Sequence, residues 1–351
     1  MSDIIEKEAD LCVADTAENG KIAVDLLSEQ KTYDLILLDI NMPKMDGIGF
    51  LKYLNENNNK IPTLMVSSIA SRSTKETMKA LELGAYDFVK KPAGLRGVTN
   101  NEFREQLLEK IHCAFKLRHI PVGKPVREKP EEKKSVVEKP VVKPVIKRRA
   151  SSSGGGKNTL LFIASSTGGP KALQSVVPKI PAEIGCPVVI VQHMPSGFTQ
   201  SLAERLDEMS PCKVVEAQDG DVLKNGVVYV AKGGYQLYAN PVNRNEHQLL
   251  VKKDEPRGGL RPCADIFLES LLDCNYEKIF CAVLTGMGSD GTKGLLQLKK
   301  LKEVYTVGQS EESCVVYGMP RAAAKAEVVD RVADLQDVAE LLIAAWQQNG
   351  G

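Results

Sequence analysis

Short apolar runs alternate with amphipathic stretches along most of this chain, and this order is the strongest constraint on its fold. The runs LILL and TLMV are continuous buried-strand patterns, whereas Ile22 and Leu26 lie at helical spacing. Strands that alternate with helices form parallel sheets covered on both faces. The pattern therefore predicts doubly wound α/β domains, with a β-rich insertion near residues 220–253.

A segment rich in proline and charge interrupts this alternation. Residues 121–150 contain five prolines, ten Lys or Arg and four Glu, and a Ser/Gly run follows them. Prolines at this density prevent a regular helix, and charged residues and glycines bury little apolar surface. We therefore predict a first domain over residues 1–119, a flexible linker over 120–157 and a second domain over 158–347.

Composition predicts a cytoplasmic protein that neither inserts into a membrane nor binds nucleic acid. Hydrophobic residues at 43% and charged residues at 26% are typical of globular chains, and a formal charge of +1 creates no global field for an anionic partner. No window matches a membrane helix, and the N-terminus has no signal-peptide pattern. The eight cysteines include no C-x-x-C pair, so reduced core thiols are expected rather than a metal site.

Three polar residues are expected at neighbouring strand ends of the first domain. Asp39 ends LILLD, Ser67 ends the next apolar run, and Lys91 follows a third. A carboxylate, a hydroxyl and an ammonium at one sheet edge can accept a phosphoryl group and hold its oxygens. The stretch LLDINMPKMDGIGFL, with the later MVSS and FVKKP, resembles a response-regulator receiver domain of flavodoxin-like fold over about residues 9–118. The resemblance implies that Asp39 is the phosphoacceptor, that Ser67 and Lys91 support it, and that a chemotaxis histidine kinase is the phosphodonor.

One departure from the receiver pattern concerns its metal. Receivers carry an acidic pair that binds Mg²⁺ at the end of their first strand, and the 38 residues before Asp39 leave no room for that strand. LCVADTA matches the second strand of the family, and MSDIIEKEAD matches the tail of its first helix. Without the pair, Mg²⁺ lacks most of its oxygen ligands, which counts against phosphorylation of Asp39.

The second domain also places polar residues after its predicted strands. Ser165 and Ser166 end the first strand in IASSTGGP, before two glycines and a helix expected near Pro170. His193 follows PVVIVQ, and Asp290 lies in GMGSDG after KIFCAVLT. Because carboxyl ends of parallel strands share one edge, these residues can form a triad in which Asp290 orients His193 and His193 deprotonates a serine.

The loop GMGSDG supports a second interpretation. It satisfies the dinucleotide fingerprint G-x-G-x-x-G between a strand and a helix, and Glu311 or Glu312 lies about 20 residues further on. Against this, Asp290 stands where the pyrophosphate would bind, and a carboxylate repels anions there. A dinucleotide-binding protein is therefore the alternative hypothesis.

Four motifs make the first interpretation specific. IASSTGGP, VQHMPSGF, LRPCADIFLESLL and LTGMGSDG occur in this order behind the receiver-like part and the linker. Together they resemble the chemotaxis protein-glutamate methylesterase family, with a Rossmann-like catalytic domain. The resemblance implies Ser166, the residue directly before TGG, as nucleophile, with His193 and Asp290 completing the triad. It also implies an oxyanion contact from the backbone of Met287.

The same resemblance implies the surroundings of the nucleophile and the reaction. Thr167, Gly168 and Gly169 line the turn after Ser166. The expected enzyme is a carboxylic ester hydrolase that removes glutamyl γ-methyl esters from methyl-accepting chemotaxis receptors and deamidates receptor glutamines, without a metal or organic cofactor. The chain departs from the family at Ser165 and Cys263, where alanine and serine are common.

Three hypotheses about regulation and activity stay open at this point. The chain is a methylesterase regulated by its receiver, or a constitutively active one whose receiver no longer docks. The third is an adaptor that binds receptors without catalysis, which an intact triad argues against.

Overall fold

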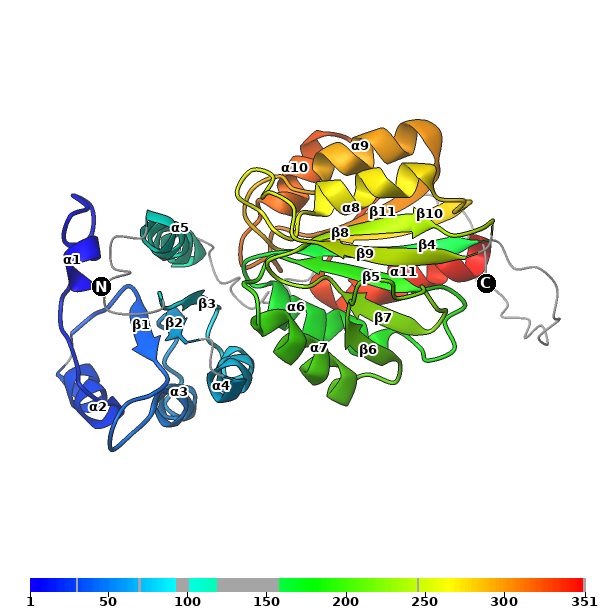
Figure 1. Ribbon diagram of the computed structural model, residues 1–351. Helices are drawn as coiled ribbons and strands as arrows, with labels where there is room; N and C mark the ends of the chain where they lie inside the picture. Colours follow the sequence, from blue (N-terminus) through cyan, green and yellow to red (C-terminus); the bar gives the residue numbers. More distant parts are fainter. Residues whose placement is uncertain (30, 69–70, 93–100, 119–157, 245, 350–351) are drawn as a thin grey trace, which may run out of the picture.

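The computed structural model describes residues 1–29, 31–68, 71–92, 101–118, 158–244 and 246–349. These residues form two α/β parts, and each contains a parallel sheet flanked by helices (Figure 1). The doubly wound fold class predicted from the alternating pattern is thereby confirmed. The predicted linker, 120–157, lies outside the described residues. Within the described ranges, no helix combines the length and the apolar character needed to cross a bilayer.

The N-terminal part contains a three-stranded sheet in the order β1-β2-β3, with parallel neighbours. Helices α2, α3 and α4 lie on one side of this sheet and α5 lies on the other (Figure 1). Asn19 caps α2 by accepting hydrogen bonds from two backbone N–H groups of its first turn, and Asp46 caps α3 in the same way with one. The elements are α1 (Ser2–Ile5), α2 (Gly20–Ser28), β1 (Ile36–Asp39), α3 (Gly47–Glu56), β2 (Thr63–Ser67), α4 (Ser71–Glu82), β3 (Asp87–Lys90) and α5 (Asn101–Arg118).

The strand expected over LCVADTA is wrong. Residues 11–17 adopt no regular secondary structure, although the run carries the apolar residues of a strand. A strand needs a neighbouring strand to satisfy its backbone groups. Within the described residues β1 pairs with β2 alone, so residues 11–17 form no ladder with β1. A cavity of about 560 Å³, lined by residues of this segment and of β1, separates the two.

The C-terminal part contains a seven-stranded parallel sheet in the order β12-β11-β10-β4-β5-β7-β6 and an antiparallel hairpin, β8-β9. The predicted β-rich insertion is thus divided, since β7 joins the main sheet and only β8 and β9 form the separate hairpin. The elements are β4 (Thr159–Ser165), α6 (Gly169–Val176), η2 (Val177–Lys179), β5 (Val188–Gln192), α7 (Phe198–Met209), β6 (Lys213–Glu216), β7 (Val227–Val230), β8 (Gln236–Pro241), β9 (His247–Lys252), α8 (Ala264–Ser270), η3 (Leu271–Asp273), β10 (Lys278–Val283), α9 (Thr292–Leu301), β11 (Glu303–Gln309), α10 (Met319–Lys325), β12 (Arg331–Ala333) and α11 (Leu335–Asn349).

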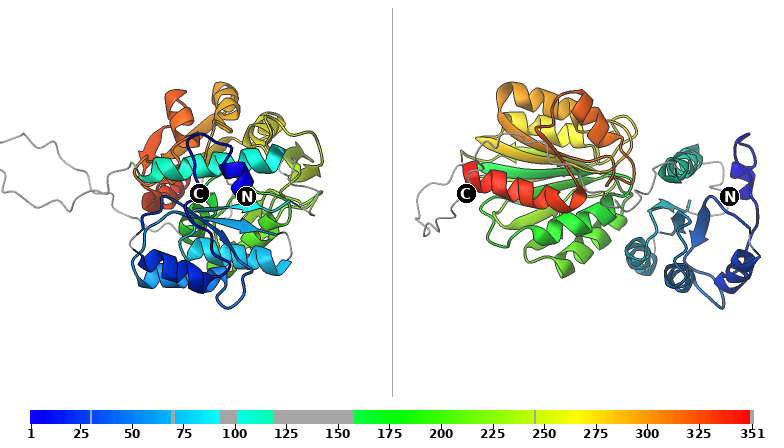
Figure 2. Two further views of the ribbon diagram at one scale, coloured as in Figure 1. Left: turned by 90° about the vertical axis from the view of Figure 1, so that its left-hand side faces the viewer. Right: turned by 180° about the vertical axis from the view of Figure 1, so that it is seen from behind.

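Strand β4 is buried on both faces of this sheet. Leu161 and Ile163 pack in the cluster that contains α6, α7 and α11, whereas Leu160 and Phe162 pack in the cluster that contains α8 and α9. Figures 1 and 2 show these two groups of helices on opposite faces of the sheet. Because successive strand residues point to opposite faces, two consecutive residues at the end of β4 serve different environments.

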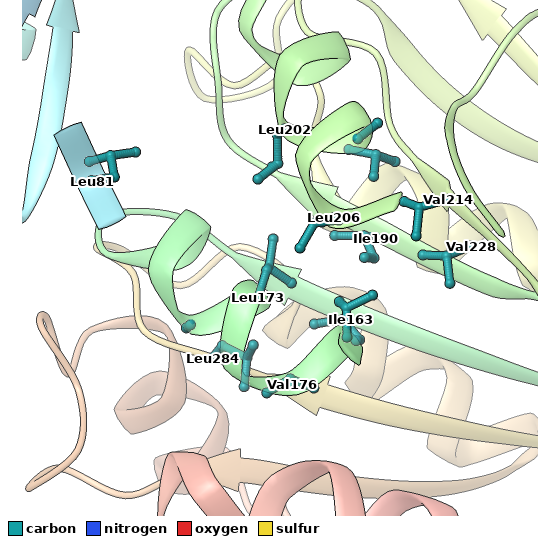
Figure 3. Close-up of a cluster of buried hydrophobic side chains, with 14 of the residues drawn as sticks. Leu81, Ile163, Leu173, Val176, Ile190, Leu202, Leu206, Val214, Val228 and Leu284 are labelled. Carbon is teal, nitrogen blue, oxygen red and sulfur yellow. The ribbon is translucent and has the colours of Figure 1, made fainter. Parts of the chain in front are cut away.

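The N-terminal part packs against α6 and α7 of the C-terminal part. Leu81 of α4 belongs to the same buried cluster as Leu173 and Leu202 (Figure 3). The rings of Phe88 and Phe198 stack with centroids 4.4 Å apart across this interface. The two parts therefore share a continuous apolar contact, in which burial of hydrocarbon surface favours docking.

Candidate active site

A hydrogen-bonded imidazole and carboxylate form the centre of the site. His193 directly follows β5, and its Nε2 lies 2.7 Å from Oδ2 of Asp290, in the loop after β10. Both side chains are largely withdrawn from solvent, with 10% of the imidazole and 4% of the carboxylate exposed. The sequence-predicted pairing of these two residues thus has the geometry of a base and the group that orients it.

The carboxylate of Asp290 also accepts hydrogen bonds from the loop that starts α8. Burial raises the pKa of Asp290, but the hydrogen bond and charge of His193, with further donors, outweigh burial and lower it to about 2. The carboxylate is therefore ionised at neutral pH and can only accept, so Nε2 of His193 donates the hydrogen bond to it. The further donors are Cys263 Sγ (3.1 Å) and the backbone N–H groups of Ala264 (2.6 Å), Asp265 (2.9 Å) and Gly291 (3.0 Å).

Ser166 lies beside this pair at the end of the neighbouring strand. Ser165 and Gln192 are register partners on β4 and β5, so Ser166 and His193 follow adjacent strand ends. The backbone N–H of Ser166 donates to the carbonyl of Thr285 at 3.0 Å. Its hydroxyl makes no hydrogen bond to another residue in the described ranges. The structure therefore pairs His193 with Asp290 and leaves the predicted nucleophile adjacent but unbonded, as is common for catalytic hydroxyls without substrate.

The turn after Ser166 requires glycine and leads into α6. Gly168 has φ of 77°, and a Cβ there would meet Val315 at 2.5 Å. The N–H of Gly169 closes the turn by donating to the carbonyl of Ser166 at 2.7 Å. The backbone N–H groups of Thr167 and Met287 donate no hydrogen bond to any described residue. These two N–H groups, one in the predicted turn and one in the predicted oxyanion loop, therefore have no protein acceptor among the described residues.

The loop GMGSDG has the backbone that a dinucleotide fingerprint predicts but not its electrostatics. Gly288 and Gly291 have positive φ, and the loop links β10 to α9. The ionised carboxylate of Asp290 lies in this loop and is bonded to His193. Its negative charge opposes pyrophosphate binding, which counts against the dinucleotide hypothesis.

The N-terminal polar residues come together only in part. Lys91 forms an ion pair with Asp39, and Asp39 also accepts a hydrogen bond from the backbone of Asn41 at 3.3 Å. The Ser67 hydroxyl instead accepts a hydrogen bond from Thr77 at 2.7 Å. Among the residues that the structure describes, no group of three or more His, Cys, Asp or Glu side chains is arranged to hold a metal. The donor set around Asp39 does not fit Mg²⁺, which needs several oxygen ligands.

Sequence reasoning missed two polar residues beside the predicted triad. The sequence shows Cys263 only as a departure from the family pattern, whereas in the structure its thiol donates a hydrogen bond to Asp290. Gln192 received no role, although it is almost fully buried and its amide contacts the backbone of both Ser166 and His193. The available signal was a polar residue at the end of a fully apolar strand, in register with the equally buried Ser165.

Comparison with known proteins identifies the family of each part of the chain. Residues 161–342 match the CheB methylesterase family model, and residues 1–100 match the response regulator receiver domain model. A protein from Halalkalibacterium halodurans named protein-glutamate methylesterase/protein-glutamine glutaminase is 39% identical over 98% of this chain and 93% of its own length. A Bacillus subtilis protein of the same name is 39% identical over 97% of this chain and 92% of its own length.

A solved structure supports the assignment of the second part. The CheB methylesterase catalytic domain of Thermotoga maritima is 36% identical, with a TM-score of 0.51, and the match covers 55% of this chain and 100% of that domain. The chain belongs to the CheB methylesterase family and carries a response regulator receiver domain ahead of its methylesterase domain.

Proposed function

We propose that this enzyme hydrolyses glutamyl γ-methyl esters on methyl-accepting chemotaxis receptors in the cytoplasm, and that it deamidates receptor glutamines at the same site. The observation that carries the proposal is the 2.7 Å contact between His193 Nε2 and Asp290 Oδ2, beside Ser166 at the adjacent strand end. A serine, an oriented imidazole and free backbone N–H groups are the groups that acyl transfer requires.

The first half of the reaction forms an acyl-enzyme. Ser166 Oγ attacks the ester carbonyl while Nδ1 of His193 accepts the hydroxyl proton, and Asp290 stabilises the resulting imidazolium through Nε2. The N–H groups of Thr167 and Met287 can hold the oxyanion of the tetrahedral intermediate. Collapse of this intermediate breaks the bond to the methoxy oxygen, and the imidazolium protonates the departing group as methanol.

The second half releases the product. Water attacks the acyl-enzyme while His193 again acts as base, and breakage of the acyl bond returns the proton to Ser166 and leaves a glutamate carboxylate. A glutamine substrate follows the same course with ammonia as the leaving group. Neither half needs a metal or an organic cofactor.

The receiver contacts the loop that supports the nucleophile turn, which favours the regulated hypothesis over the constitutive one. Val315 packs against the buried receiver cluster that includes Leu64 and Leu107, and it also fills the space beside Gly168. The receiver resemblance implies a chemotaxis histidine kinase as phosphodonor and Asp39, paired with Lys91, as acceptor. Because the donor set around Asp39 does not fit Mg²⁺, the proposed restraint rests on docking of the receiver and not on phosphorylation. If the receiver restrains the site, the full chain turns over more slowly than a chain that starts near residue 154. Equal rates would instead support constitutive activity.

Replacement of the nucleophile tests the proposed reaction. Ser166→Ala removes the attacking oxygen, so methanol release from methylated receptor should fall by several orders of magnitude. Ser175→Ala is a matched control, because this serine lies on α6 and its hydroxyl donates to the carbonyl of Lys171, its one hydrogen bond within the described part of the chain. Both variants should show wild-type circular dichroism. Full activity in folded Ser166→Ala would refute the assignment.

A further inference from the structure

One buried amide links the backbone of the predicted nucleophile to that of the predicted base. Gln192 ends β5 with 1% of its surface exposed. Its Nε2 donates to the carbonyl of Ser166 at 2.9 Å and to the carbonyl of His193 at 3.1 Å. Both hydrogens of one amide group are therefore used to hold two residues that come from different strands.

The orientation of this amide is set by its partners. Two carbonyl oxygens can only accept, so the NH₂ group of Gln192 must face them. Its Oε1 then faces the hydroxyl of Ser165, which donates at 2.6 Å. Ser165 is fully buried, and thus no solvent competes for this contact. The NH₂ group and the oxygen of Gln192 and the hydroxyl of Ser165 thus all have hydrogen-bond partners, which makes the network rigid.

The network lies on the opposite face of the sheet from the reacting side chains. Ser165 precedes Ser166 and Gln192 precedes His193, and neighbouring strand residues point to opposite faces. The amide also packs against Gly169, where a Cβ would overlap its oxygen. Gln192 therefore holds the ends of β4 and β5 and the turn at Gly169 from one face of the sheet. The side chains of Ser166 and His193 point to the other face, so the amide stays outside the space that a substrate would occupy.

We propose that Gln192 is a positioning residue that holds Ser166 and His193 in register for proton transfer, and that Ser165 orients its amide. The proposal rests on the proposed function, because it assumes that these two residues react together. Small displacements of reacting groups lower rates strongly, by about 100-fold for 1 Å. A positioning role therefore predicts a loss in kcat, whereas KM should change little.

Three variants of the full chain test this role. Gln192→Leu keeps the side-chain bulk and removes all three hydrogen bonds, and its kcat for methanol release should fall about 100-fold with KM within about twofold. Ser165→Ala keeps both donor contacts and removes only the orienting hydroxyl, so its kcat should fall less, about 10-fold. Thr159→Val is the matched control, since it removes a buried hydrogen bond from Trp346 at the other end of β4. Its kcat should equal that of the wild type.

A second readout separates this proposal from the proposed function. A fluorophosphonate forms a bond between serine Oγ and phosphorus and expels fluoride, so its labelling rate reports the reactivity of Ser166 without a receptor substrate. Labelling should slow in Gln192→Leu and Ser165→Ala by the same factors as kcat. A wild type that is labelled but releases no methanol would contradict the proposed function alone, and the labelling rates would still test Gln192.

Two results would overturn the positioning role. The first is a wild-type kcat and labelling rate in folded Gln192→Leu or, where that variant does not fold, in folded Ser165→Ala. The second is an equal loss of kcat in Thr159→Val, because the effect would then follow from general destabilisation of β4. Circular dichroism and thermal melting of each variant establish which proteins are folded.

Discussion

The thiol of Cys263 lies 3.1 Å from Oδ1 of Asp290, and the other oxygen of this carboxylate accepts a hydrogen bond from Nε2 of His193. Burial, together with the negative charge of Asp290, raises the pKa of Cys263 to about 12. The thiol therefore stays protonated and donates a hydrogen bond to the carboxylate at neutral pH. Cys263 thus supports the carboxylate that orients the predicted base, His193.

Two substitutions of Cys263 should separate the effect of its hydrogen bond from the effect of its volume. Cys263→Ser retains a donor, so its kcat should stay within about twofold of the wild type, whereas Cys263→Ala should lower kcat about 5- to 10-fold through loss of one hydrogen bond to a charged group. Steady-state methanol release measures both. If the alanine variant matched the serine variant, the contact would have no part in catalysis.

Removing the charge of Asp290 should lower kcat far more than removing the thiol of Cys263. In Asp290→Asn an NH₂ group replaces one of two oxygens that face only donors, and His193 loses the partner that holds its proton on Nε2, so kcat should fall about 10³-fold or more. Asp265→Asn is the matched control, because that buried carboxylate accepts from Gly294 and does not contact His193. A similar loss in both variants would point to local unfolding at the start of α8.

Acid should destabilise the protein partly through a histidine far from the triad. His247 is 2% exposed, and its Nε2 accepts from the backbone of Asn275 at 3.1 Å. Burial, assisted by the charge of Lys302, lowers the pKa of His247 below its ordinary value of 6.5. The unfolded chain then binds the proton more readily, so this contribution to stability is fully present above pH 6.5 and is lost as the pH falls below it.

Urea unfolding at several pH values measures this effect. Between pH 6.5 and the lowered pKa, the free energy of unfolding of the wild type should fall relative to that of His247→Gln, with a slope approaching about 1.4 kcal/mol per pH unit. Glutamine retains an acceptor for Asn275 and does not titrate. Parallel curves for the two proteins would exclude His247 as the source.

Reversing one charge at the domain interface should raise turnover, and reversing its partner as well should restore it. Arg205 of α7 forms an ion pair with Glu82 of the receiver. An exposed pair contributes little, about 1 kcal/mol at most, but Arg205→Glu replaces attraction with repulsion and should raise turnover of the full chain by about 2- to 5-fold if docking restrains the site. The double variant Arg205→Glu/Glu82→Arg restores the pair and should return turnover to the wild-type value. An increase that persists in the double variant would rule out this ion pair as the restraint.

Much of the fold follows from local pattern. The largely apolar runs TLLFIAS and VVIVQ form β4 and β5, because burial on both faces favours apolar residues. Gly168 lies in the turn into α6, because its positive φ favours glycine. The run LCVADTA shows the limit of such reasoning. It has strand composition but forms no strand, because a strand exists only through pairing with a neighbour.

The sequence by itself determined that Ser166, His193 and Asp290 each follow a parallel strand, and therefore that they meet at one sheet edge. Only the tertiary structure decided what holds them there. The thiol of Cys263 and the amide of Gln192 reach the site from loops and strands whose approach depends on packing between distant segments. Hydrogen bonds between such segments produce no periodic pattern in the sequence, because the order of strands in the sheet brings the partners together and their spacing along the chain does not.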